Sequence, residues 1–146
     1  MAIQPAYRDA ERTNDSKRSS RIYKDINLNF TRHPTTKQVS VLTDAAAVKR
    51  SVRNLVQIGQ YEKPFHPEIA SGVRDMLFEN MTPFTAQTLQ TKITDVITNF
   101  EPRALLTSVG VIPRFDINQY EVTVEFYIQN APTELIDLSF TLERLR

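Results

Sequence analysis

The sequence predicts an α+β fold with an N-terminal β-hairpin, about three helices and a C-terminal three-stranded antiparallel sheet. Apolar and polar residues alternate from 120 to 129 and again from 136 to 143, which is typical of strands with one buried face. From 86 to 100 the apolar residues instead recur at helical spacing, after the helix-start signal Thr82-Pro83. Because only short breaks separate the strands, they favour an antiparallel meander with the helices on one face and a more polar face opposite.

The composition narrows the range of functions. The chain has 146 residues, the size of one ordinary domain, of which 40% are hydrophobic and 24% charged. A formal net charge of +1 gives no basic field for a nucleic-acid partner. No apolar run approaches the roughly 20 residues of a membrane helix, and the N-terminal residues lack the apolar core of a secretory signal. There are no cysteines, and His33 and His66 lie too far apart for a ligand motif, so we expect no metal and no cofactor.

The N-terminal part divides into an arm and a hairpin. Residues 1–20 are polar, and through Lys24 the chain carries six basic and three acidic residues. We expect residues 1–20 to form a flexible arm that either orders against a partner or is a plain disordered terminus. Residues 21–146 are expected to form one α+β domain. It begins with a strand from 22 to 30, a turn at 33–36 and a second short strand from 37 to 42. His33, beside Pro34, is interpreted as a turn residue.

Three helices are expected next. The first is capped by Thr43 or Asp44 and ends near Ile58. The second runs from 67 to about 80, with a proline at its first turn, and the third runs from 82 to 100. The first helix also carries a basic cluster that is either a solvated face or a contact for an acidic neighbour, namely Lys49, Arg50 and Arg53.

The strands of the sheet follow the helices. In the first strand, Leu105, Thr107, Val109 and Val111 are expected to share one face, and Pro113 ends the pairing or places this strand at an edge. The last strand, residues 134–144, is expected to lie at an edge unless the N-terminal hairpin covers it. An exposed edge invites pairing by another chain. The candidate docking strand is defined by its polar face, Asp137, Ser139, Thr141 and Glu143.

Glu101-Pro102-Arg103 joins the last helix to the sheet. The residue before a proline avoids the α region, so the helix is expected to stop near Glu101. In an extended segment residues two apart point the same way, so we expect Glu101 and Arg103 to form an exposed pair of opposite charges. Such a pair is either a solvated corner worth little to stability or a partner-binding site, in which Arg103 can bind a carboxylate bidentately.

Four stretches between Arg21 and Arg146 resemble one known family. They are YKDINLNF, SVRNLV, PFHPEIASGVRDMLFEN and FEPR. With the order of hairpin, helices and sheet, the chain resembles the sheath-initiating baseplate wedge proteins of contractile-tailed phages, whose relatives include a type VI secretion baseplate component. The resemblance implies a structural protein in a viral tail baseplate, assembled in the host cytoplasm.

The same resemblance implies the partners. Glu101, Pro102 and Arg103 would bind neighbouring wedge subunits. The tail sheath protein would add a strand to the sheet, and the tail tube would lie nearby.

A catalytic site is not predicted. Seventeen acidic residues allow many carboxylate pairs, and hydrolysis of a glycoside needs only two in a cleft. No arrangement in the sequence selects such a pair, and no histidine lies close to a likely nucleophile. The family has sometimes carried a tail-lysozyme label, so a peptidoglycan-degrading lysozyme is the alternative function; we expect no enzyme.

Overall fold

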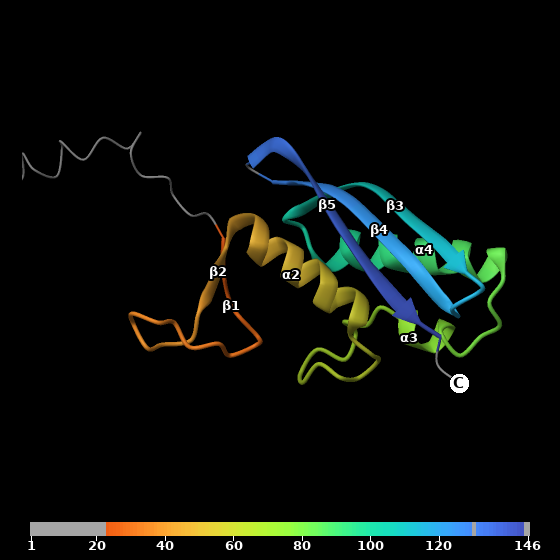
Figure 1. Ribbon diagram of the computed structural model, residues 1–146, viewed down its shortest axis with the longest axis horizontal. Coiled ribbons are helices and arrows are strands. Elements are labelled where there is room, and N and C mark those ends of the chain that lie inside the picture. The colour runs from red at the N-terminus through yellow and green to blue at the C-terminus, as the bar shows by residue number, and fades with distance from the viewer. Residues whose placement is uncertain (1–22, 130, 145–146) are drawn as a thin grey trace, which may run out of the picture. The chain divides into compact units, whose positions relative to one another are not determined.

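The computed structural model describes residues 23–129 and 131–144 (Figure 1). These residues fall into two compact units, one ending at Asp44 and the other beginning at Ala45. We describe each unit by itself. The arm expected at residues 1–20 lies outside the described residues, and the prediction of one domain over residues 21–146 stays a prediction.

The first unit is the predicted hairpin. Strand β1 (Lys24–Ile26) pairs antiparallel with β2 (Val41–Thr43), and an isolated bridge joins Arg32 to Val39. Both strands are shorter than the expected 22–30 and 37–42. Strand β1 ends early because the chain turns at 28–29 and Phe30 adopts a positive φ of 51°. The turn expected at 33–36 is present.

Three described helices belong mainly to the second unit. Helix α2 (Asp44–Gln57) agrees with its predicted bounds. Helix α4 (Pro83–Phe100) also agrees, and the Thr82 hydroxyl caps it by accepting from the Thr85 N–H at 3.1 Å. The second expected helix, 67–80, is wrong in extent, because α3 covers only Val73–Met76. Gly72 precedes it with φ 60°, a left-handed conformation that a continuous helix does not contain.

The C-terminal sheet is the predicted antiparallel meander. Strands β3 (Ala104–Arg114), β4 (Gln119–Ile128) and β5 (Ala131–Glu143) lie in the order β3-β4-β5. The register of β3 against β4 shifts between Leu106 and Ser108, so Thr107 occupies a β-bulge. The expectation that four β3 residues share a face is therefore wrong. The bulge leaves Leu105 49% exposed, whereas Val109 is buried against the helices.

One face of the sheet forms the core of this unit. Every second residue of β4 is buried, as the alternation predicts, and α4 packs against β3 on this side (Figure 1). The core therefore lies between the helices and the sheet, and the polar residues of β4 and β5 face away from it. The fully buried side chains of β4 are Tyr120, Val122, Val124 and Phe126.

Candidate functional site

The corner between α4 and β3 is a tight turn. The Glu101 N–H donates to the Ile97 carbonyl at 2.9 Å and so closes the helix. The Ala104 N–H donates back to the Glu101 carbonyl at 3.0 Å, which closes a turn around Pro102 and Arg103. The chain is therefore turned here, and not extended as the sequence suggested.

Glu101 and Arg103 bind each other across this turn. Arg103 Nε lies 2.6 Å from Glu101 Oε1 and Arg103 Nη2 lies 2.8 Å from Oε2, a bidentate ion pair. The Glu101 side chain is only 3% exposed and that of Arg103 is 24% exposed. The pairing was predicted, but the expectation of an exposed pair is wrong for Glu101. Its carboxylate faces into the protein, where both of its oxygens accept hydrogen bonds from the same chain.

Helix α2 also contributes to this site. The Ser51 hydroxyl hydrogen-bonds to the Glu101 carboxylate. Burial by itself raises the pKa of Glu101, but the hydrogen bonds from Arg103 and Ser51 and the charge of Arg103 outweigh burial, so the pKa lies below its usual value of 4.5. Glu101 is therefore ionised at neutral pH, and it ties the turn to α2.

The outward side of the corner is what another protein can reach. Pro102 is exposed, and the guanidinium of Arg103 is partly so. The Arg103 carbonyl accepts from the Gln129 N–H at 2.8 Å, beside the end of β4. Since hydrogen bonds hold both sides of Pro102, the corner presents this residue in a fixed position.

Strand β5 is an outer strand of the sheet. No strand lies beyond it among the described residues, and the side chains of Asp137, Ser139, Thr141 and Glu143 are exposed as predicted. Arg53 Nη2, from α2, lies 3.5 Å from the Ser139 carbonyl oxygen. This contact indicates that the carbonyl faces away from β4. In an antiparallel strand the N–H and C=O of one residue point to the same side, so the Ser139 N–H also faces the open edge.

The contact of Arg53 was not predicted. Arg53 belongs to the basic cluster that the sequence left as either solvated or paired with an acid. In the structure it approaches a backbone carbonyl 86 positions away. No local signal in the sequence identifies such a long-range contact.

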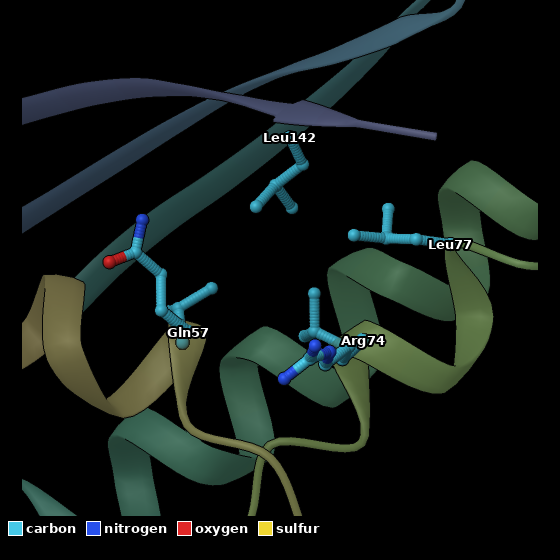
Figure 2. A pocket seen from close by; sticks show the side chains of 6 residues that line it. Gln57, Arg74, Leu77 and Leu142 are labelled. Carbon is cyan, nitrogen blue, oxygen red and sulfur yellow. The ribbon is translucent and has the colours of Figure 1, made fainter. Parts of the chain in front are cut away.

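A shallow hollow lies where α2, α3 and β5 meet. It has a volume of about 270 Å³, and Figure 2 shows Leu77 and Leu142 pointing into it, with Gln57 and Arg74 beside them. Its other lining residues are Val56 and Val73, so the lining is mainly apolar and contains no carboxylate. A second hollow of about 310 Å³, in the hairpin unit, is likewise lined without an Asp or Glu. Neither hollow resembles the paired-carboxylate cleft of a glycosidase.

Each histidine contacts residues that are close to it in the sequence. His33 Nδ1 accepts from the N–H groups of Thr35 and Thr36, both at 3.3 Å, which confirms its role in the turn. His66 pairs with Glu68 at 2.9 Å on the surface. Within residues 23–129 and 131–144, no group of three or more His, Asp or Glu residues could hold a metal ion. Among the described helices, none is both long and apolar enough to cross a bilayer.

The fold first defines a class, a small α+β module with a rigid helix-to-sheet corner and an open sheet edge. Residues 43–133 match the family model described as baseplate wedge protein gp25, and the chain belongs to this family. The baseplate wedge protein gp25 of Enterobacteria phage T4 is 30% identical over 123 residues, which cover 84% of this chain and 92% of that protein. The resemblance seen in the sequence is thereby confirmed.

Two solved structures share the fold. A putative tail lysozyme from Geobacter sulfurreducens aligns with a TM-score of 0.66 at 20% identity, over 74% of this chain and 98% of that one. A chain of the anti-feeding prophage (AFP) baseplate aligns with a TM-score of 0.58 at 22% identity, over 85% and 87%. The chain is thus a member of the baseplate wedge protein gp25 family, and its fold is shared with both solved structures.

Proposed function

We propose that this chain is a structural, non-catalytic wedge subunit that joins neighbouring wedge subunits and forms a platform for the tail sheath. Neighbouring wedge subunits bind the corner formed by Glu101, Pro102 and Arg103. The sheath protein binds the edge of β5. Assembly takes place in the host cytoplasm, and the protein then resides in the tail baseplate, near the tail tube.

The open backbone of β5 supports the sheath interaction most directly. Ser139 directs its N–H and C=O away from β4, and residues two positions away in a strand have the same direction. Asp137 and Thr141 therefore offer further donors and acceptors along one edge. An extended sheath segment can satisfy these groups as an added strand, while its side chains select the register. The contact of Arg53 with Ser139 gives way when the strand binds.

The corner contributes to wedge binding mainly through its rigidity. The Glu101–Arg103 pair is internal, so it does not offer two free charges to a partner. It fixes the turn instead, and a surface that is already ordered loses less conformational entropy when it binds. A wedge subunit then contacts Pro102 and the exposed part of the Arg103 guanidinium.

The sheath interaction is tested by replacing Ser139. Ser139→Pro removes the N–H that faces the open edge, and we expect baseplates that carry it to nucleate little or no full-length sheath. Ser139→Ala keeps that N–H and is the matched control, with sheath nucleation close to wild type. Circular dichroism must first show that the proline variant is folded. Normal sheath assembly on a folded Ser139→Pro baseplate would rule out this edge.

The lysozyme alternative is tested by an assay on peptidoglycan. Neither hollow described above contains a carboxylate, so the purified full-length chain is expected to release no more muropeptide than a buffer control. Turnover that is abolished by replacing a single Asp or Glu would establish an enzyme and overturn the non-catalytic function.

A further inference from the structure

One face of the N-terminal hairpin is apolar at its centre and exposed. The register pairs Ile26 with Val41, and Val39 lies on the same face because it is two residues from Val41. Their side chains are 62%, 54% and 44% exposed, respectively. Three apolar side chains are therefore exposed side by side on this face, where another chain could bury them.

These apolar side chains are only partly buried within the hairpin, although Ile26 and Val41 are paired across the strands. The opposite face of the hairpin carries a polar network, in which Asn27 Nδ2 donates to Thr31 Oγ1 and Ser40 Oγ, both at 3.0 Å. The hydroxyls of Thr31 and Ser40 are 2.7 Å apart. None of the described residues from 23 to 43 is buried. A two-stranded hairpin is only marginally stable alone in water, so covering its apolar face would stabilise it.

The charges on this face all have one sign. Lys24 lies opposite Thr43 at one end and Arg32 lies opposite Val39 at the other, so a cation flanks the apolar centre on each side. Asp25 follows Lys24 in the strand, so its side chain points to the opposite face. Asp44 Oδ1 accepts from the Tyr23 N–H and closes the base of the hairpin. Within the described hairpin, the apolar face therefore carries cations and no carboxylate.

The spacing of these cations indicates the form of the partner. Thr43 and Val39, the residues opposite Lys24 and Arg32, are four positions apart, which is about 14 Å along a strand. A second extended segment covers the same distance between its own residues i and i+4. The hollow of about 310 Å³ beside Val39 and Val41 leaves room for a side chain.

We infer that the hairpin face, defined as Lys24, Ile26, Arg32, Val39 and Val41, binds an extended segment of a neighbouring baseplate subunit. That segment has an apolar residue at its centre and a carboxylate two residues to each side. The apolar residue covers Ile26 and Val41, and the carboxylates pair with Lys24 and Arg32. This surface shares no residue with the corner or with β5, and its function does not depend on either.

Photo-crosslinking in assembled baseplates tests this inference. Full-length protein with a photoreactive phenylalanine derivative in place of Val41 is incorporated into baseplates, irradiated and analysed by mass spectrometry. We expect a crosslink to a different baseplate subunit, within a segment that has an acidic residue on each side of an apolar one. Crosslinks confined to residues 45–146 of the same chain, crosslinks to a second copy, or no crosslink in assembled baseplates would each refute it.

Charge reversal tests the role of the two cations. Lys24→Glu combined with Arg32→Glu should weaken binding of the crosslinked subunit on the order of tenfold or more at low salt, and less at high salt. Lys24→Arg combined with Arg32→Lys keeps both charges and is the control, with near-normal binding. Circular dichroism establishes that both variants are folded. Equal binding by the two folded variants would contradict the charge pairing, whatever happens at the corner or at β5.

Discussion

The corner and the edge of β5 differ in how fully their polar groups are hydrogen-bonded within the subunit. At the corner, Glu101 and Arg103 satisfy each other, and the backbone groups beside them bond to Ile97, Ala104 and Gln129. At β5, the outward carbonyl of Ser139 accepts one long hydrogen bond of 3.5 Å from a side chain. The corner therefore satisfies its own polar groups, whereas the edge of β5 has backbone groups that an added strand could bind.

This difference predicts how each region responds to change. A substitution at the corner breaks contacts inside the subunit, so it should reduce stability and thereby binding. A substitution that affects only the edge of β5 should reduce sheath docking while the subunit stays folded. Stability and assembly measured on the same variants therefore distinguish the two regions.

The largest effect on stability is expected from Arg103→Ala. It leaves the Glu101 carboxylate, only 3% exposed, with Ser51 but without its cation. Breaking a buried ion pair from one side costs about 3–5 kcal/mol, and we expect about 3 kcal/mol because Arg103 itself is 24% exposed. Chemical denaturation of the purified protein measures this loss in the free energy of unfolding.

Glu101→Gln is the matched control for that experiment. The amide preserves the shape of the side chain and can still accept a hydrogen bond, and the remaining Arg103 charge can reach solvent. We expect a smaller loss, about 1.5 kcal/mol, typical of one hydrogen bond to a charged group. Equal and negligible losses for both variants would mean that the pair does not hold the corner.

The second prediction concerns the contribution of Glu101 to the stability of the protein at acidic pH. Because the pKa of Glu101 is lower in the folded protein than its usual 4.5, ionised Glu101 contributes stability above pH 4.5. That contribution is lost as the pH falls through the lower, folded-state pKa. Thermal melts between neutral pH and the acid range should therefore show a decline that is shallower in Glu101→Gln. Parallel pH profiles for the two proteins would show that another group is responsible.

The smallest effect is expected from Arg53→Ala at the edge. A hydrogen bond as long as 3.5 Å at an exposed site contributes little, so the free energy of unfolding should change by less than about 1 kcal/mol. The substitution uncovers the Ser139 carbonyl, and an open edge favours pairing between copies. Analytical ultracentrifugation of the purified protein should therefore show more self-association. A monomer identical to wild type would mean that Arg53 does not protect the edge.

Most of the fold could be predicted because its signals are local. The alternation of β4 and the helical spacing of α4, with its Thr82 cap, follow directly from the order of side chains. The shortness of α3 was missed because a glycine inside an otherwise helical pattern does not reveal its positive φ. The bulge at Thr107 has no local signal either, and it reversed the predicted face of Leu105.

The pairing of charges at the corner was predicted from the sequence, but the burial of Glu101 was not. The sequence identifies Glu101-Pro102-Arg103 as the junction and the two charges as a pair. It does not reveal that Glu101 is buried, since burial depends on parts of the chain that are distant in sequence, and Ser51 of α2 reaches the carboxylate from 50 positions away. The contact between Arg53 and Ser139 depends on the packing of α2 beside β5 and was unpredictable for the same reason.

A structure of the assembled particle tests the central claim most directly, because it shows which chains touch the corner and the edge in the place where they function. The account predicts a neighbouring wedge subunit against Pro102 and Arg103, and a strand of the sheath protein hydrogen-bonded to the Ser139 backbone of β5. Solvent at both places, with the subunit held in the baseplate only through other surfaces, would contradict it.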